Sequence, residues 1–259
     1  LKIVDEFVIN VGESEDDTLL MIQSIHSSKI RIIKSKWNDT MQERGFVYGQ
    51  QKMIAQYNCT GDWAFYIEGD EVYHENDLEQ IRESMIIHLD DPNVEALAFD
   101  FYHFYGNANS YLDSPGWYRS EVRIIKNSVR SYAPDGLFWL VLNSNKQGRY
   151  PRAKHTGVSC YHYGWLRSQE QMNLKSEKVQ KYWAKDPVKV DYSQMDQSII
   201  KEFQGSHPEI IKEWLPKESG LYKVDPNYKP TKKQKKHRMM IKFEKIFGVD
   251  LSKKHYKLV

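Results

Sequence analysis

Short apolar runs alternate with helical patterns over the first hundred residues. The runs predict buried strands at 6–11, 29–34, 63–67 and 94–105. Between them, apolar residues recur three or four positions apart, which predicts helices after Ser14, over 48–58 and after Asn76, with Ser14 and Asn76 as caps. This alternation is typical of a mostly parallel sheet that is covered by helices on both faces.

The pattern loosens after about residue 106. Residues 119–126 and 137–142 predict antiparallel additions to the sheet, whereas 172–183 and 197–203 predict helices. Thr231 is a candidate cap for a last helix that carries Met240, Phe243 and Phe247 on one face. We therefore expect an α/β fold with three α/β/α layers. Residues 1–105 and 106–225 would form two halves of one domain, and 226–259 a basic helical extension.

Composition places the chain among globular proteins. Its 259 residues are 40% hydrophobic and 13% aromatic, and the net charge of +2 gives no general attraction to nucleic acid. Two cysteines are too few for a disulfide framework and favour a reducing, cytoplasmic compartment. No apolar run approaches the ~20 residues that a membrane span needs.

The strand predicted over 63–67 runs directly into an acidic segment. Glu68 and Asp70 are separated by one glycine, so both carboxylates can point the same way from an extended loop. In an open α/β sheet, ligands bind beyond the carboxyl ends of the strands. Two carboxylates without a soft ligand suit Mg²⁺ or Mn²⁺, which keep water and take substrate phosphates as further ligands. For an isolated pair of this kind, a solvated turn is the alternative.

Two successive segments, VDEFVINVGESEDDT and GFVYGQQKMIAQYNCTGDWAFYIEGDEVYHE, are followed later by YHYGWLR and by GSHP with Trp214-Leu215. Together they resemble a bacterial subgroup of the family 2 glycosyltransferases of the GT-A fold. Ile67-Glu68-Gly69-Asp70-Glu71 stands where that family has its D-x-D metal motif, with Glu in place of the first Asp. The resemblance covers residues 1 to about 220, and the family's first strand, with its nucleotide-base loop, would precede Leu1.

The resemblance implies a metal-dependent, inverting glycosyltransferase of cell-surface glycan synthesis. Such an enzyme moves a sugar from a nucleotide-diphosphate donor to the hydroxyl of a glycan or lipid-linked acceptor. Asp70, Glu68 and His162 would hold Mn²⁺ or Mg²⁺, which neutralises the leaving diphosphate. Residues 1–105 would bind the donor, and 106–225 would bind the acceptor.

The acceptor hydroxyl needs a general base, usually a carboxylate. Asp135, in a turn of the acceptor half, is the first candidate, and Glu121 is the second. An Asp before Gly commonly forms a turn without any catalytic role, and that interpretation of Asp135 stays open.

The remaining candidate ligands each have a structural alternative. Glu13, Asp16 and Asp17 follow the first strand, where the family binds the nucleoside, but acids at that place also cap and solvate a helix start. Arg167 can contact phosphate or form a surface salt bridge. His162 is flanked by aromatic residues, as a packed core histidine would also be.

The basic tail can lie on an anionic membrane surface, where lipid-linked acceptors reside, or simply cover the domain as a solvated helix. The first interpretation places the protein at the inner face of the membrane. Two other functions stay open. One is a nucleotidyltransferase of similar layout, although no glycine-rich, basic phosphate loop is visible. The other is a non-catalytic carbohydrate-binding domain that binds sugar without nucleotide or metal.

Overall fold

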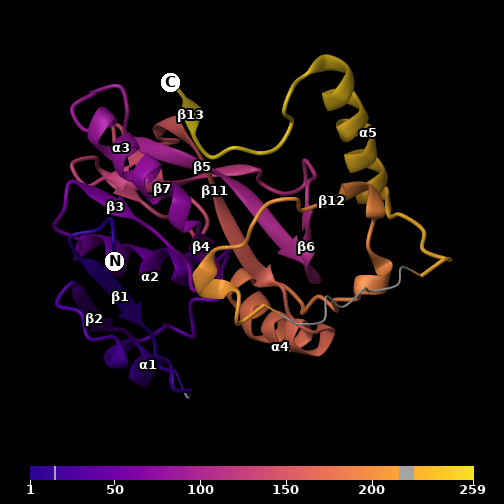
Figure 1. Cartoon of the computed structure of the whole chain (residues 1–259), viewed down its shortest axis with the longest axis horizontal. Helices are drawn as coiled ribbons and strands as arrows, with labels where there is room; N and C mark the ends of the chain where they lie inside the picture. Colours follow the sequence, from indigo (N-terminus) through magenta and orange to yellow (C-terminus); the bar gives the residue numbers. More distant parts are fainter. Residues whose placement is uncertain (15, 216–224) are drawn as a thin grey trace.

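The structure, a computed structural model of the chain, describes residues 1–14, 16–215 and 225–259 (Figure 1). The end of the family resemblance, at about residue 220, lies outside the described residues. The helices and strands follow one another as β1 (Phe7–Val11), α1 (Thr18–Ser24), β2 (Ile30–Lys34), α2 (Phe46–Tyr57), β3 (Trp63–Phe65), β4 (Glu71–Tyr73), α3 (Leu78–His88), β5 (Ala96–Tyr105), β6 (Asn107–Leu112), β7 (Ser120–Lys126), β8 (Ser131–Tyr132), β9 (Leu140–Leu142), β10 (Gly148–Arg149), β11 (Arg152–Trp165), α4 (Gln169–Gln180), β12 (Ile200–Glu202), α5 (Lys232–Phe247) and β13 (Lys257–Leu258).

One large sheet organises this mixed α/β fold. Its main path runs β12-β6-β5-β11-β13, with β7 paired to β5, β3 paired to β7 and β4 paired to β11. The two long strands β5 and β11 are parallel, as are β11 and β13, but the other pairings are antiparallel. The sheet is therefore mostly antiparallel, whereas the alternation of elements predicts a mostly parallel one. Gly106, with φ of 71°, shows one reason: it lets the chain reverse directly from β5 into β6 without a crossover helix.

A separate small sheet forms the first part of the chain. β1 and β2 pair in parallel from Phe7 opposite Ile30 to Val11 opposite Lys34, and α2 packs against β1. In Figure 1 these elements lie together beside the large sheet, at the indigo end of the chain. The strands predicted over 6–11 and 29–34 and the helix predicted over 48–58 are confirmed.

Local side chains change some predicted elements. The helix predicted over 197–203 is wrong: a short 3₁₀ turn, Gln197–Ile199, leads into β12, which pairs with β6 at the sheet edge. The predicted caps also differ, because Asp16 accepts a hydrogen bond from the Thr18 amide at 3.0 Å in place of a Ser14 cap. His74, not Asn76, caps the turn before α3.

The core lies on both faces of β5 and β7. Leu97, Phe99 and Ile124 have no exposed surface, and Ile81 of α3 packs with them. β7 is buried along its whole length although it carries Glu121, Arg123 and Lys126. Buried charges require partners, so the charged residues of β7 must pair with side chains from neighbouring elements.

The C-terminal extension adds a strand as well as the predicted helix. A capping box of Thr231 and Gln234 begins α5, as Thr231 predicts. The chain then returns to the sheet, where the Tyr256 hydroxyl lies 2.9 Å from the Ser120 hydroxyl and the Lys257 amide donates to the Pro151 carbonyl at 2.8 Å. Across the described ranges, none of the helices has the length and apolar character to cross a bilayer.

Candidate functional site

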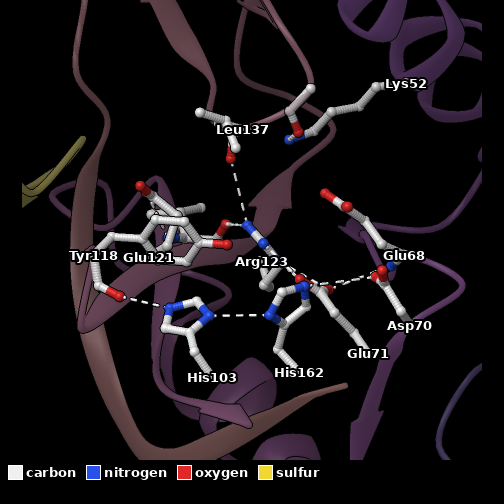
Figure 2. A network of polar contacts seen from close by, with 12 residues as sticks. Lys52, Glu68, Asp70, Glu71, His103, Tyr118, Glu121, Arg123, Leu137 and His162 are labelled. Atoms are coloured by element: carbon white, nitrogen blue, oxygen red, sulfur yellow. Dashed lines mark hydrogen bonds and ion pairs between the residues drawn. The ribbon is translucent and has the colours of Figure 1, made fainter. Parts of the chain in front are cut away.

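Three neighbouring strands bring the candidate site together. β4 pairs with β11 so that Glu71 lies opposite His162, and β5 pairs with β11 so that His103 lies opposite His162 on the other side. Asp70 precedes β4, and its carbonyl accepts a hydrogen bond from the Tyr163 amide at 2.8 Å. The strand register therefore places the acidic loop and two histidines side by side (Figure 2).

Two Lewis bases converge over a glycine. The Oδ1 atom of Asp70 lies 3.7 Å from the Nε2 atom of His162. An ideal Cβ atom on Gly164 would lie 2.6 Å from the Asp70 Oδ2 atom and 2.6 Å from the His162 Nε2 atom. The space between the carboxylate and the imidazole exists because residue 164 has no side chain. In the sequence this position is visible as a glycine between two large aromatic residues, Tyr163 and Trp165.

The hydrogen bonds of His103 fix the orientation of His162. The Nε2 atom of His103 lies 2.8 Å from the Tyr118 carbonyl, which only accepts, so that nitrogen carries the hydrogen. Burial lowers the pKa of His103 to about 3, with a smaller contribution from His162, so its ring is neutral and its Nδ1 atom accepts. That Nδ1 atom lies 3.0 Å from the His162 Nδ1 atom, which therefore donates.

The free ring nitrogen of His162 consequently faces Asp70. Burial lowers the pKa of His162, although the charge of Asp70 opposes this, and a neutral ring that donates from Nδ1 keeps a lone pair on Nε2. This is the arrangement by which proteins orient metal-binding histidines, with the second nitrogen donating to a neighbouring group.

Positive side chains surround Asp70. The Lys175 ammonium lies 3.0 Å from the Asp70 Oδ2 atom and 3.2 Å from the Gly164 carbonyl. Burial raises the pKa of Asp70, but the positive charges of Lys175 and Arg167 and the hydrogen bond from Lys175 oppose this, and the pKa is lowered overall. Arg167 is exposed and close enough to contribute to this shift. Asp70 is therefore an ionised carboxylate in a cationic environment that also suits phosphate groups.

The donor atoms fit a divalent cation with few protein ligands. A carboxylate oxygen suits Mn²⁺ and Mg²⁺, and Mg²⁺ takes one or two carboxylates with water and phosphate oxygens. An imidazole nitrogen is a ligand that Zn²⁺ and other transition metals also take. Among the described residues, no group of three or more His, Cys, Asp or Glu side chains forms a metal site. The structure brings Asp70 and His162 together, while Glu68 does not complete a three-ligand cluster with them.

A buried ion pair holds the acidic loop in place. Glu71 and Arg123 have side chains 1% exposed, and both the Arg123 Nε atom, at 3.1 Å, and the Nη2 atom, at 2.6 Å, donate to Glu71. The second Glu71 oxygen accepts from the Glu68 amide at 3.3 Å. On its other side, Arg123 donates to the Leu137 carbonyl at 3.4 Å. Arg123 thus links the acidic loop to the turn that carries Asp135.

Glu68 and Lys52 are buried groups whose charges act on each other's pKa. Burial, followed by the charge of Glu71, raises the pKa of Glu68 to about 7. Burial, followed by the charge of Arg123, lowers the pKa of Lys52 to about 7. The Lys52 ammonium lies 3.5 Å from the centre of the Trp139 ring, and Figure 2 shows the Glu68 carboxylate on the Lys52 side of the network. The opposite charges of Glu68 and Lys52 each reduce the effect of burial on the pKa of the other group.

The two candidate bases differ in accessibility. The Oδ1 atom of Asp135 accepts from the Leu137 amide at 2.8 Å, and burial raises its pKa. The side chain is half-buried. Glu121 is 1% exposed and its carboxylate is hydrogen-bonded to His255, which the C-terminal segment brings to it. Asp135 is accessible, but its hydrogen bond to the Leu137 amide is also the contact of a turn-forming Asp, whereas Glu121 is enclosed with a histidine partner.

The acids after β1 stand apart from this network. Glu13 forms a surface pair with Lys36 at 3.6 Å, and Asp17 precedes α1 without a side-chain cap. The hydrogen bonds of Asp16 to Ser14 and to the Thr18 amide lower its pKa to about 2. These contacts match the structural alternative, which is capping and solvation of a helix start.

Sequence reasoning missed the residues that position the site. His103 interrupts an apolar strand, Arg123 is a charge inside a predicted strand, and Lys52 lies on the buried side of a predicted helix. A polar or charged side chain within a buried segment is the signal they share, because such a residue requires a buried partner.

Comparison with known proteins identifies no family for the chain. No protein-family model matches the chain, and no curated protein matches it.

Proposed function

We propose that the chain is a metal-dependent, inverting glycosyltransferase built on a GT-A-like arrangement. The observation that carries the proposal is the pair of Asp70 and His162 over Gly164, oriented through His103. The acids of a solvated turn would not need a buried histidine such as His103, which orients a second histidine toward Asp70. The proposed donor is a nucleotide-diphosphate sugar, and the acceptor is a glycan or a lipid-linked molecule of cell-surface glycan synthesis.

Asp70 and His162 would hold Mn²⁺ or Mg²⁺. The cation, when bound, supplies positive charge where the diphosphate leaving group gains negative charge. Arg167 and Lys175 add positive charge at the same place. Since Lys175 already contacts Asp70, its ammonium would move from the carboxylate to the diphosphate when a cation is bound.

Asp135 would act as the general base. Its carboxylate would take the proton of the acceptor hydroxyl as the oxygen forms a bond to the anomeric carbon of the sugar. The bond from that carbon to the donor phosphate breaks, and its electron pair leaves on the diphosphate. Attack from the face opposite the leaving group inverts the anomeric centre. The raised pKa of Asp135 suits this role, because a stronger base accepts the proton more readily.

A thermal-shift screen tests the proposal. Uridine, guanosine, cytidine and thymidine diphosphates would each be added with and without Mn²⁺. A ligand at a hundredfold its dissociation constant stabilises the folded state by about 2.7 kcal/mol, which raises the Tm of a chain this size by roughly 5–10 °C. We expect one diphosphate to raise the Tm only with Mn²⁺.

The screen includes two matched variants. Asp70→Asn removes the charge at the site and should abolish the shift, whereas Asp90→Asn, at an exposed position, should keep it. If none of the diphosphates shifts the wild type, or the shift survives in Asp70→Asn, the proposal fails. A response to nucleoside triphosphates alone would instead favour a nucleotidyltransferase.

A further inference from the structure

Helix α5 is fixed to the domain through its polar side. The Arg238 guanidinium lies 2.8 Å and 2.9 Å from the two carboxylate oxygens of Asp196, which is completely buried. Glu244 accepts from Arg119 at 2.7 Å and 3.0 Å. Ile241 packs between these pairs against the apolar cluster beneath. These residues, spaced three apart, define the inward face of the helix.

The opposite face is apolar and exposed. Met239, Phe243, Ile246 and Phe247 follow the spacing of one helical stripe, and 68%, 47%, 75% and 60% of their surfaces are exposed. The Phe243 and Phe247 rings contact each other with centroids 4.2 Å apart. A surface helix of a globular domain normally turns its apolar stripe toward the core. In α5 the orientation is reversed, and Figure 1 shows the helix at the edge of the molecule.

The charges around this stripe indicate what covers it. Exposed lysines are distributed along the helix, at Lys232, Lys233, Lys235, Lys236, Lys242 and Lys245. Within 232–247 the acidic residue is Glu244, and Arg119 already neutralises it. A second copy of this helix would bring the lysines together and repel. An anionic lipid surface would accept the apolar side chains and pair with the lysines at the same time.

We propose that α5 docks the protein on an anionic phospholipid membrane. The helix would lie in the plane of the interface, with the stripe from Met239 to Phe247 inserted among the acyl chains and the lysines at the headgroups. Val249 and Leu251, which are also exposed just beyond the helix, would extend the inserted surface. This inference does not depend on glycosyl transfer, because it uses residues outside the candidate site.

Vesicle co-sedimentation of the full chain tests the inference. The vesicles would be pure phosphatidylcholine or phosphatidylcholine with phosphatidylglycerol. We expect binding to the anionic vesicles only, and weaker binding at high salt because the lysine contribution is screened. The double variant Ile246→Ser/Phe247→Ser should weaken binding by about tenfold or more, since two buried apolar side chains are lost.

A matched variant separates this effect from a general loss of surface apolar residues. Ile86 and Ile87 are 58% and 70% exposed in the last turn of α3, so Ile86→Ser/Ile87→Ser should bind vesicles as the wild type does. Wild-type protein that stays in the supernatant with anionic vesicles would overturn the inference. So would a dimer in analytical ultracentrifugation that only the α5 variant dissociates, because the stripe would then be a contact between copies.

Discussion

His103 and His162 face each other through their Nδ1 atoms at 3.0 Å, and the Tyr118 carbonyl on the far side of His103 determines which ring donates. The result is a chain of hydrogen bonds that ends in a lone pair directed at Asp70. Neither His103 nor the Tyr118 carbonyl would touch a substrate. Their effect is to fix the tautomer and the orientation of His162.

Replacing His103 should therefore weaken cation binding without removing a ligand. His103→Leu leaves His162 without its acceptor, and loss of such a partner typically costs 10–100-fold in metal affinity. His103→Gln keeps a donor for the Tyr118 carbonyl and an acceptor for His162, so it should stay close to the wild type. Calorimetric titration with Mn²⁺ compares the three proteins. If His103→Leu and His103→Gln bind Mn²⁺ with equal affinity, His103 does not orient His162 for cation binding.

A methyl group at residue 164 should fill the site. The Cβ atom of Gly164→Ala would lie 2.6 Å from both Asp70 and His162, so these side chains must move apart. We expect the Mn²⁺-dependent nucleotide shift to disappear, and the overpacking to lower the stability without ligand by about 1–3 kcal/mol. Gly69→Ala is the control, since a Cβ there meets no atom within 4 Å. If both alanine variants keep the shift, the space over Gly164 is not the binding site.

The ion pair between Glu71 and Arg123 should be essential for stability. Removing one partner leaves a charge that is buried without compensation, and this typically destabilises by about 3–5 kcal/mol. Glu71→Gln should therefore lower the free energy of unfolding in urea by that amount. The exposed pair of Glu79 and Arg82, at 2.8 Å, is the comparison, and Glu79→Gln should cost less than about 1 kcal/mol. Similar losses for the two variants would contradict the structural role of the buried pair.

Stability should rise with pH above 7 because of Lys52. Its pKa is about 7 in the folded state, against an ordinary lysine value of 10.5 in the unfolded chain, so the unfolded chain binds more protons between these values. Stability from this group is present above pH 10.5 and lost as pH falls toward 7, with a slope of at most about 1.4 kcal/mol per pH unit. Arg123, Glu68, Glu121 and Glu71 are the charged groups that act on this pKa besides burial.

Urea unfolding at pH 7 and pH 9 measures this slope. Lys52→Met removes the titrating group and should flatten the rise, whereas Lys178→Met, at an exposed position, should leave it unchanged. A Lys52→Met protein with the same pH slope as the wild type would show that the buried lysine is not its source.

Much of the first hundred residues could be predicted from periodicity. β1, β2, α2 and β5 follow from apolar patterns that are local in sequence. The pairing of the strands could not be predicted, because it depends on partners far along the chain. The 197–203 segment is an example. Its apolar spacing fits a helix, but Ile200–Glu202 pairs as a strand with the edge of β6.

The residues of the candidate site also differ in whether they could be predicted from local sequence. Asp70 and His162 could be proposed from motifs, because each stands in a distinctive local segment. His103 and Arg123 could not, since their roles come from register: His103 matters because it lies opposite His162, and Arg123 because Glu71 reaches it from another strand. Glu121 is a candidate base by its place in the sequence, but His255, from a segment 134 residues away, encloses it.

The most direct test of the account is an electron paramagnetic resonance titration of Mn²⁺. Free Mn²⁺ gives a strong signal that falls as the ion binds, so the method counts bound ions in the presence of the nucleoside diphosphate selected by the screen. We expect one Mn²⁺ per wild-type chain and a loss of about tenfold or more in affinity in both Asp70→Asn and His162→Ala. Wild-type affinity in both variants would contradict the central claim that Asp70 and His162 form a metal–diphosphate site.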